Sequence, residues 1–414
     1  MTMRVRRASK AVGPWAALIV ALALVVLQPH TSAQPRPIRV GGTLPLTGVF
    51  AAQGKVHEAA GRAFVQMTNE KGGLLGRSLE WVLLDDESQP DKAAALYERL
   101  ITEDKVDLII GPYGTASITA AMRVAEKYGY VFPHHTASLT YAYTYRRHFP
   151  TWYVGLNTHM TTPAKVFDAY RSLPGSRRPQ TVGFVVNKFP GTQFLAYGRQ
   201  NVGGAVRVAE QKGLRTVLDL SFDLGTTDWV PIAQQVRRAN PDLLYVAGLA
   251  LDGVNLLQAL AQLGWRPRHH FHQWPSPGAM LAALPLTDRA TSVTIFVPHE
   301  PYLSYPGARD FVNRYRAWAK ATGLAYSEPD VQSAASWSAW QVLTFGVQEC
   351  RCLDHGTIAE VLLSKPVPTV QGMLRFDRQQ QNYGDDIQAV MQIQDGRWWA
   401  VWPPSMTAEG RQLR

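Results

Sequence analysis

The 414-residue sequence has few cysteines and, beyond its N-terminus, no long hydrophobic run. Its two cysteines, Cys350 and Cys352, can close a small disulfide loop, but two thiolates cannot supply the four ligands of a structural zinc site. No apolar segment of membrane-spanning length follows Leu27. The small number of cysteines argues against a redox enzyme and a zinc-stabilised domain. The lack of further long apolar segments argues against a protein with several membrane spans.

Sequence motifs of the common catalytic and cofactor sites are also missing. Gly41–Gly48, at the end of the first predicted strand, lacks the glycine spacing of a dinucleotide fingerprint, and no Walker phosphate loop is present. The sequence contains neither a Gly-x-Ser-x-Gly elbow nor a His-Glu-x-x-His zinc helix. We therefore interpret the protein as a non-enzyme that needs no cofactor and no metal.

The histidines could suggest a metal site, because several are close together in the sequence. Cysteine or carboxylate partners at ligand spacing are absent, so we favour roles in loops or pocket walls. The histidines concerned are His134, His135, His269, His270 and His272.

Acidic residues follow the second predicted strand at Asp85–Glu87. A carboxylate pair there could serve acid–base chemistry. Because Pro90 favours a helix start just after it, we interpret the run as a solvated strand end.

The positive charge is modest and dispersed. The formal net charge is +10, and the basic pairs Arg177-Arg178 and Arg237-Arg238 are short. Nucleic-acid binders concentrate Lys and Arg on one face beside stacking aromatic residues. We therefore expect no nucleic-acid partner.

The N-terminus has the pattern of a secretory signal peptide. Arg4, Arg6, Arg7 and Lys10 precede the apolar run Ala16–Leu27, which is shorter than the roughly 20 residues of a membrane-spanning helix. Small residues at Thr31–Ala33 predict cleavage between Ala33 and Gln34. Removal of residues 1–33 lowers the formal net charge to +6 and makes the mature protein periplasmic. An uncleaved anchor is the alternative.

From Ile38 onward, short β-branched runs alternate with amphipathic stretches, which is typical of a parallel sheet covered by helices. The pattern occurs twice and predicts an α/β protein with two doubly wound parallel-sheet lobes. In such sheets ligands bind beyond the carboxyl ends of the strands. The predicted strands are Ile38–Leu44, Leu79–Leu84, Val106–Ile110, a strand from Val131, then Thr181–Val186, Val217–Ser221, Leu243–Ala247 and a strand near Phe271. In the second series we expect one continuous helix from about Thr192 to Lys212.

The last third starts no third series, because Ala308–Thr322 and Gln332–Gln348 predict consecutive helices. We expect the chain to return to the first lobe near Val293–Glu300 and to the second near Gln371–Asp377, which gives a three-segment hinge. A hairpin around Asp395-Gly396 then joins the second lobe. The resulting N-terminal lobe comprises residues 36–153 and 298–371, and the C-terminal lobe comprises residues 154–297 and 372–410.

Gly111–Ser117 lies between a buried strand and a helix, where a ligand could bind. Free N–H groups and the positive end of the dipole at a helix start favour an anion, and Thr115 can add a hydroxyl donor. A plain helix cap explains the same residues equally well.

In this segment and in several others, the chain resembles the solute-binding proteins of branched-chain amino acid and amide importers, the leucine/isoleucine/valine-binding family. The resemblance implies the type I periplasmic binding protein fold and a monomer that captures a small-molecule solute for an ABC importer. The permease and ATPase of that importer would be its partners. The matching segments are Gly42–Gly48, Asn69–Gly76, Asp85–Pro90, Ile109–Pro112 and Gln371–Asp377.

The same resemblance implies which residues hold the ligand. Thr115 and Thr136 correspond to hydroxyl residues that bind a ligand carboxylate together with nearby backbone groups. Those backbone groups belong to Tyr113, Gly114 and His134.

Aromatic residues complete the implied site. Phe189 matches the aromatic residue that closes over the ligand from the second lobe, although Phe189-Pro190-Gly191 replaces the family's Tyr-Gly. Gln53 occupies a position that is often aromatic in the family, and Phe50 can substitute for it.

The sequence departs from the amino-acid binders at the acid that pairs with the ligand ammonium group. The corresponding loop is Gln273–Ser276, which has no carboxylate, and Asp252 is the nearest substitute. An unpaired buried ammonium would cost several kcal/mol. We therefore expect an aromatic or aliphatic carboxylate, or an amide, that stacks on Trp274, Phe189 and Tyr113.

Two other functions stay open from the sequence. A periplasmic sensor subunit that presents solute to a membrane receptor would have the same sequence features. A hydrolase that uses the His134-His135 loop is disfavoured because no positioned nucleophile accompanies it.

Overall fold

The computed structural model describes residues 1–3, 35–152, 157–200, 202–376 and 386–414. The chain divides into residues 1–36 and a compact unit over residues 37–414, and all elements below belong to the second unit. The predicted cleavage site at Ala33 and Gln34 lies outside the described residues, as does most of the predicted signal peptide.

The first sheet is parallel, with strand order β2-β1-β3. Its register pairs Leu44 with Asp85, so the loops that follow β1 and β2 leave the sheet at the same edge. A short parallel pair, β4-β5, and an antiparallel pair, β11-β12, accompany it. The elements are β1 (Ile38–Leu44), α2 (Ala51–Glu70), β2 (Leu79–Asp85), α3 (Pro90–Thr102), β3 (Leu108–Ile109), α4 (Thr115–Tyr128), β4 (Phe132–His134), β5 (His148–Pro150), α11 (Ala308–Ala321), α12 (Val331–Cys350), α13 (His355–Ser364), β11 (Val367–Thr369) and β12 (Gly372–Leu374).

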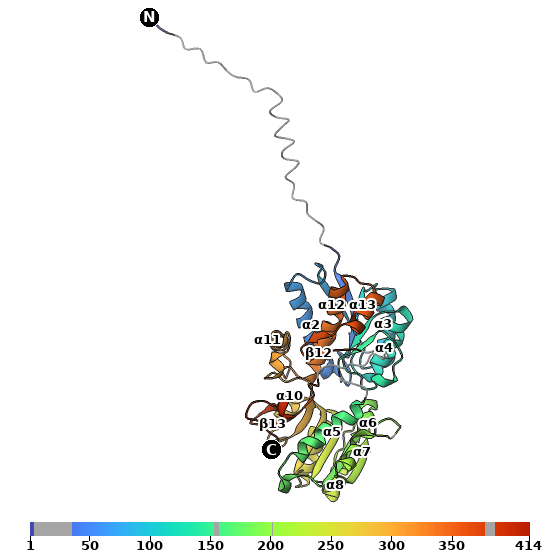
Figure 1. Ribbon diagram of the computed structural model, residues 1–414, viewed down its shortest axis with the longest axis vertical. Helices are drawn as coiled ribbons and strands as arrows, with labels where there is room; N and C mark the ends of the chain where they lie inside the picture. The colour runs from blue at the N-terminus through green and yellow to red at the C-terminus, as the bar shows by residue number, and fades with distance from the viewer. Residues whose placement is uncertain (4–34, 153–156, 201, 377–385) are drawn as a thin grey trace. The chain divides into compact units, whose positions relative to one another are not determined.

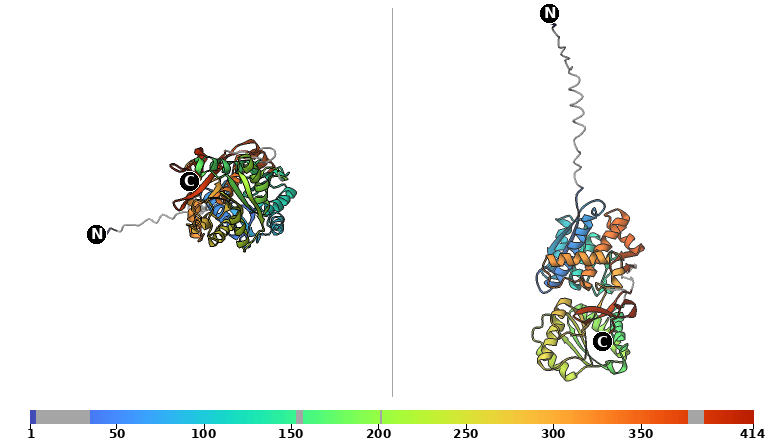
Figure 2. Two further views of the ribbon diagram at one scale, coloured as in Figure 1. Left: turned by 90° about the horizontal axis from the view of Figure 1, so that it is seen from below. Right: turned by 90° about the vertical axis from the view of Figure 1, so that its left-hand side faces the viewer.

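Segments far apart in the sequence form the core around this sheet. Helix α2 packs against α11 and α12, and the ring centroids of Phe64 and Trp337 are 5.0 Å apart in this core. Helices α3 and α4 pack against each other around Tyr97 and Ile118. Figure 2 shows the blue N-terminal and orange C-terminal segments side by side. Helices from the last third of the chain therefore pack beside the first sheet.

The second sheet has the strand order β14-β13-β10-β9-β8-β6-β7, in which only the β13-β14 hairpin runs antiparallel to its neighbours. The hairpin predicted around Asp395-Gly396 is thus confirmed. Figure 1 shows helices α5 to α8 gathered around this sheet. The elements are α5 (Thr158–Arg171), β6 (Thr181–Asn187), α6 (Pro190–Tyr197), α7 (Gly204–Gln211), β7 (Arg215–Phe222), α8 (Val230–Ala239), β8 (Leu243–Ala250), α9 (Asp252–Gln262), β9 (His269–Pro275), α10 (Pro277–Ala282), β10 (Thr291–Thr294), β13 (Ala389–Gln394) and β14 (Arg397–Trp402).

Both faces of the second sheet are buried, which explains its nearly continuous hydrophobic strands. Phe184 and Val186 face a core that includes residues of α5 and α7, whereas Val185 faces a core that includes residues of α8 and α9. Successive side chains of a strand point to opposite faces. The sheet is therefore covered by helices on both sides, as the predicted doubly wound α/β fold requires.

Two details differ from the sequence prediction. The helix expected from Thr192 to Lys212 is two helices, because Gly203 and Gly204 adopt φ angles of +89° and +77° that interrupt a helix. Strand β10 is an additional strand at the start of the predicted return segment.

Of the three predicted hinge segments, one is described throughout. After β10, residues Ile295 to Val297 join the core around α2 and α12, as expected. The first crossing falls at residues 153–156, outside the described residues. The third, predicted at Gln371–Asp377, is described except for Asp377, and its strand β12 pairs with β11. Phe376, the last described residue of this segment, packs on Phe149, with ring centroids 5.1 Å apart.

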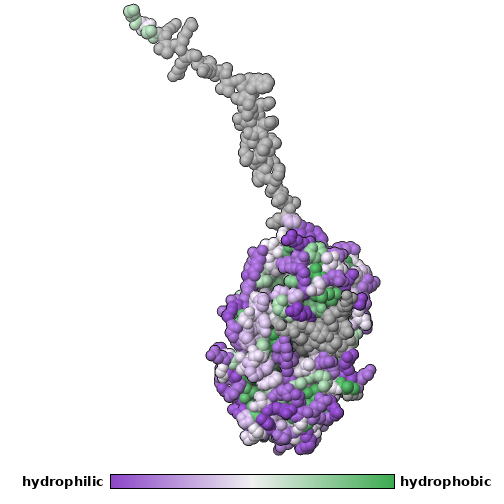
Figure 3. Space-filling model, viewed as in Figure 1, coloured by the Kyte–Doolittle hydropathy of each residue, from purple (hydrophilic) through white to green (hydrophobic). Residues whose placement is uncertain are grey.

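Cys350 and Cys352 form a disulfide at the end of α12. Among the described residues, no helix is sufficiently long and apolar to cross a membrane. The face of residues 37–414 visible in Figure 3 is mostly hydrophilic or neutral, with scattered hydrophobic residues. Hydrophobic side chains are instead concentrated in the cores of the two sheets.

Candidate functional site

The loop after β3 and the loop after β4 are joined through hydrogen bonds to threonine hydroxyl groups. The Gly114 N–H donates to Thr136 Oγ1 at 2.7 Å, and the Ser138 N–H donates to Thr115 Oγ1 at 3.1 Å. Gly114 precedes α4 with a φ of +85°, which favours glycine. Because each oxygen already accepts a backbone hydrogen bond, its own hydroxyl hydrogen is the group that could donate to a ligand.

The start of α4 offers further donors. The first N–H groups of an α-helix have no partner within the helix. Among the described residues, the N–H groups of Thr115, Ala116 and Ser117 donate to no backbone or side-chain acceptor. Together with the helix dipole, they favour an anion beside Gly114.

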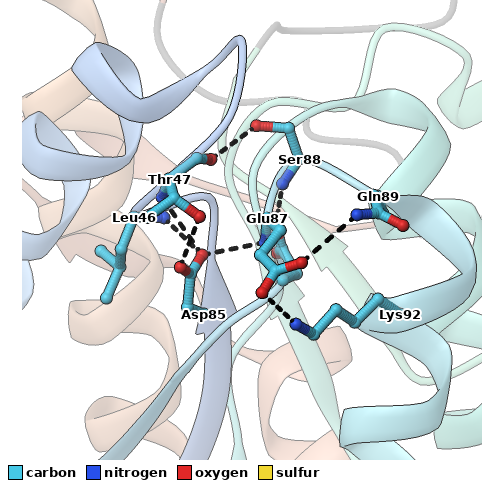
Figure 4. Close-up of polar contacts among 8 residues, drawn as sticks. Leu46, Thr47, Asp85, Glu87, Ser88, Gln89 and Lys92 are labelled. Atoms are coloured by element: carbon cyan, nitrogen blue, oxygen red, sulfur yellow. Dashed lines mark hydrogen bonds and ion pairs between the residues drawn. The ribbon is translucent and has the colours of Figure 1, made fainter.

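The acidic run Asp85–Glu87 fixes the loop that follows β1. Asp85 accepts hydrogen bonds from the N–H groups of Leu46 and Thr47 and from the Thr47 hydroxyl (Figure 4). Partial burial opposes these bonds, but they keep the pKa of Asp85 below its usual value. Ser88 Oγ accepts from the Phe50 N–H at 3.1 Å, so the acidic loop positions Phe50.

Asp86 corrects the interpretation of this run as a solvated strand end. Its side chain is buried and accepts hydrogen bonds from Thr43 Oγ1 at 2.8 Å and the Ser88 N–H at 3.1 Å. Burial raises the pKa of Asp86 to about 6, against the effect of these bonds. The acidic run therefore connects the loop after β1 to the loop after β2 through hydrogen bonds.

Aromatic rings from both sheets meet at the site. The Phe50 centroid lies 5.7 Å from Tyr113 and 6.2 Å from Phe189. Phe189 immediately precedes α6, and its N–H donates to Asn187 Oδ1 at 2.8 Å. The loop after β6 is therefore fixed with its aromatic residue against those of the first sheet.

The opposing loops approach closely around Gly191. A Cβ atom at Gly191 would lie 3.1 Å from Ser138 Oγ and 3.2 Å from the Trp274 ring. Trp274 has a positive φ of 52°, which is rare for a bulky residue and occurs often at functional sites.

These residues enclose a small space. Its volume is about 20 Å³, room for about one water. A larger ligand therefore enters only if the rings move apart. The lining residues are Tyr113, Gly114, Thr136, Ser138, Trp152, Phe189, Leu249, Trp274 and Gln332.

The structure brings together five of the residues predicted from the sequence, namely Tyr113, Gly114, Thr136, Phe189 and Trp274. The Phe50 ring contacts two of them, and Thr115 Oγ1 accepts a hydrogen bond from the N–H of Ser138, which also lines the space. Gln53 lies in the first turn of α2 and is not part of the lining.

His134 also lies behind the site. Its side chain is buried, with Nε2 3.0 Å from His148 Nδ1, and only its backbone approaches the loop. Its carbonyl oxygen accepts a hydrogen bond from the Thr151 N–H at 2.9 Å.

Asp252 is engaged within the loops of the second sheet. Its Oδ2 accepts from the Leu249 N–H at 2.8 Å and from Asn187 Nδ2 at 3.1 Å. Burial raises the pKa of Asp252, and the two hydrogen bonds act in the opposite direction. Asp252 does not line the space, and none of the described lining residues is a carboxylate.

Four lining residues were not predicted from the sequence: Ser138, Trp152, Leu249 and Gln332. Ser138 lies two residues after Thr136 in a loop where hydroxyl residues alternate, which was an available signal. Gln332 starts α12, almost 200 residues later, and only the tertiary structure places it here.

The remaining histidines that the structure describes form no cluster of three metal-ligating residues. His270 Nδ1 lies 2.8 Å from His272 Nε2 in the buried part of β9. The described part of the chain contains no group of three or more His, Cys, Asp or Glu residues that could hold a metal ion.

Comparison with known families identifies the class of protein. The family described as "Periplasmic binding protein" matches residues 37–397. The chain belongs to this family. Its curated relatives include the leucine-, isoleucine-, valine-, threonine- and alanine-binding protein of Pseudomonas aeruginosa, at 21% identity over 82% of this chain and 86% of that protein.

Solved structures of periplasmic binding proteins have the same fold. A leucine-binding protein from Thermotoga maritima aligns with a TM-score of 0.70 and 19% identity, covering 87% of this chain and 97% of that one. An ABC transporter solute-binding protein from R. palustris in complex with benzoate aligns with a TM-score of 0.71 and 19% identity, covering 90% of this chain and 100% of that one. The type I periplasmic binding fold predicted from the sequence is therefore confirmed.

Proposed function

We propose that this periplasmic binding protein is the substrate-binding component of an ABC importer and captures a small carboxylate or amide by hinge closure. It binds the solute without converting it and delivers it to the permease and ATPase. The two lobes in this proposal are residues 36–153 with 298–371, and residues 154–297 with 372–410.

One observation carries the proposal: a single small space is bounded by donors on one side and aromatic rings on the other. The Gly114 loop follows β3 and Thr136 follows β4, whereas Phe189 follows β6 and Trp274 lies near the end of β9 in the second sheet. A ligand at this position touches both sheets. Only a ligand with different affinity for the open and closed states can shift the balance between them.

The chemistry of the lining favours a carboxylate without an ammonium group. The start of α4 and the Thr136 hydroxyl supply hydrogen-bond donors for an anion, and the described lining has no acid to pair with a cation. The similar R. palustris protein was solved with benzoate, an aromatic carboxylate. Aromatic carboxylates are therefore the first ligands to test.

Closure must be reversible for this function. The present space of about 20 Å³ cannot hold benzoate, so the aromatic rings must separate before the ligand enters. The rings then close over the ligand and exclude water, which strengthens the hydrogen bonds to its carboxylate.

A thermal-shift screen of the purified protein tests the proposed ligand class. The panel contains benzoate, 3,4-dihydroxybenzoate, aliphatic carboxylates, simple amides and leucine. We expect the carboxylates or amides to raise the melting temperature, because a ligand that binds only the folded state stabilises it. Recovery of the bound compound unchanged, checked by mass spectrometry, supports binding without turnover. Stabilisation by leucine alone would contradict the proposed chemistry.

Export is tested separately. We propose that residues 1–33 are removed as a signal peptide during passage to the periplasm. Intact-mass measurement of the periplasmic protein is expected to show a chain that begins at Gln34. A chain that retains Met1 would contradict this step and leave the binding proposal unaffected.

A further inference from the structure

A second and larger cavity lies apart from the site described above. Its volume is about 370 Å³, within the range of small-molecule sites, and it shares no lining residue with the first. Its walls include Phe296 in the segment after β10, Tyr326 in the loop before α12, and Trp398 in the β13-β14 hairpin. The cavity is therefore bounded by parts of the chain that accompany both sheets.

The aromatic walls of this cavity are held in place by neighbouring groups. Trp398 donates from Nε1 to the Pro277 oxygen at 3.2 Å. The Trp399 ring lies 5.3 Å from the His299 ring, and the Arg411 guanidinium lies 4.4 Å from the Trp399 centroid. Such preorganised rings lose little conformational entropy when a flat ligand stacks on them.

Most of the charged groups around the cavity are already paired. Arg316 Nε lies 3.0 and 3.1 Å from the two carboxylate oxygens of Glu328. Asp330 is buried and caps α12 by accepting from the Ser333 N–H at 2.9 Å. Arg316 and Glu328 therefore neutralise each other, and the Asp330 carboxylate is held by hydrogen bonds at the positive end of α12.

Two groups remain to set the charge preference. His299 Nε2 lies 3.3 Å from the Ala400 N–H and accepts from it, so Nδ1 carries the hydrogen and donates to the Glu300 oxygen at 2.8 Å. This assignment makes His299 neutral, in accord with the pKa that burial lowers. Arg397 has no ion pair with a carboxylate among the described residues. The cavity thus combines aromatic walls with one arginine, Arg397, that has no carboxylate partner among the described residues.

We propose that this cavity is a second binding site, for a small aromatic molecule that carries one negative charge. The ring of the ligand stacks between Phe296, Tyr326 and the Trp398-Trp399 pair, and its anionic group pairs with Arg397. The site is separate from the proposed solute cleft, with which it shares no lining residue.

Calorimetric titration of the purified full chain with indole-3-acetate, and with neutral indole, tests the proposal. We expect Arg397→Glu to weaken binding of indole-3-acetate at least tenfold and to leave binding of indole unchanged. Leu281→Trp places a large ring in the cavity and is expected to abolish binding of both compounds. These substitutions avoid the first turn of α12, because Gln332 there contacts the solute cleft.

Two control variants locate the bound probe. Arg238→Glu makes the same charge change on the exposed surface of α8 and is expected to leave both affinities unchanged. Phe189→Ala alters the solute cleft and is expected to leave the Arg397-dependent binding unchanged, so any binding of indole-3-acetate that it weakens belongs to the cleft. Circular dichroism and melting curves establish that each variant is folded, and Arg397→Glu decides the result if Leu281→Trp is not.

Two outcomes overturn the proposal. The first is an absence of indole-3-acetate binding at millimolar concentration. The second is binding that Phe189→Ala abolishes and Arg397→Glu leaves intact, which would place the probe in the solute cleft.

Discussion

The imidazole rings of His57 and His135 are stacked, with centroids 4.2 Å apart and an interplanar angle of 19°. Both side chains are buried beneath the solute cleft, and His57 Nε2 lies 3.0 Å from Gln332 Oε1. The His57 ring is also 5.2 Å from Tyr113, which lines the cleft. Residues that line the solute cleft therefore pack against a pair of uncharged imidazole rings.

This relationship predicts a loss of stability in mild acid. Burial lowers the pKa of His57 to about 4, against the hydrogen bond to Gln332, and burial lowers the pKa of His135 well below 6.5. Since the unfolded chain takes up protons first, the stabilisation is complete above about pH 6.5 and declines as the pH falls towards 4. Each such histidine contributes a slope of about 1.4 kcal/mol per pH unit.

Urea unfolding between pH 7.5 and 4.5 measures this slope. We expect His57→Gln, which keeps a polar group near Gln332, to reduce it by up to about 1.4 kcal/mol per pH unit. Lys55→Gln, at an exposed position of α2, is the control and should leave the slope unchanged. Equal slopes in His57→Gln and the unaltered protein would show that His57 is not held neutral by burial.

Asp86 has the opposite dependence on pH. Burial raises its pKa to about 6, so the folded state is favoured by protonation, and this contribution is lost as the pH rises from about 4 through 6. Asp86→Asn removes the charge and is expected to match or exceed the stability of the unaltered protein at pH 8. Asp86→Ala leaves Thr43 Oγ1 and the Ser88 N–H without their acceptor, at a cost of about 1–3 kcal/mol. Chemical denaturation at pH 8 distinguishes them, and a less stable Asn variant would contradict the assigned cause.

Thr136 is expected to serve both structure and binding. Thr136→Val removes the acceptor of the Gly114 N–H and the donor to the ligand, and should weaken binding by a few kcal/mol if the ligand is a charged carboxylate. Thr136→Ser keeps the hydroxyl and is the matched control, with an expected change in affinity below about threefold. Calorimetry on both variants is the measurement. Equal affinities for the Val and Ser variants would remove the hydroxyl from the site.

Asp252 should contribute little to ligand affinity. Its Oδ2 is occupied by the Leu249 N–H and Asn187, and the residue does not line the cleft. We expect Asp252→Asn to change the affinity for a carboxylate ligand by less than about threefold. Tight leucine binding that Asp252→Asn abolishes would instead identify it as the partner of an ammonium group.

The fold was largely predictable because its signals are local and repeated. Buried parallel strands such as Thr181–Asn187 are continuous hydrophobic runs, and helices follow them at regular spacing. The predicted continuous helix after Phe189 failed because backbone conformation at Gly203 and Gly204 outweighed the surrounding helix-forming residues.

The site was predictable only in part, for a physical reason. Thr136 and Phe189 each follow a strand directly, and the ends of parallel strands converge at one edge of a sheet. Gln332 and Trp152 reach the cleft only through packing between distant segments, which no local pattern records. The burial of Asp86 was likewise not predictable from the sequence, because its hydrogen bonds to Thr43 and Ser88 are known only from the tertiary structure.

The central claim is that a solute is held between the loops of the two sheets. Its most direct test is calorimetric titration of Phe189→Ala with the panel compound that stabilises the unaltered protein most. Since Phe189 approaches from the second sheet, we predict at least a tenfold loss of affinity, whereas Leu224→Ala, at an exposed position outside the cleft, should bind normally. Unchanged affinity in Phe189→Ala would contradict the claim.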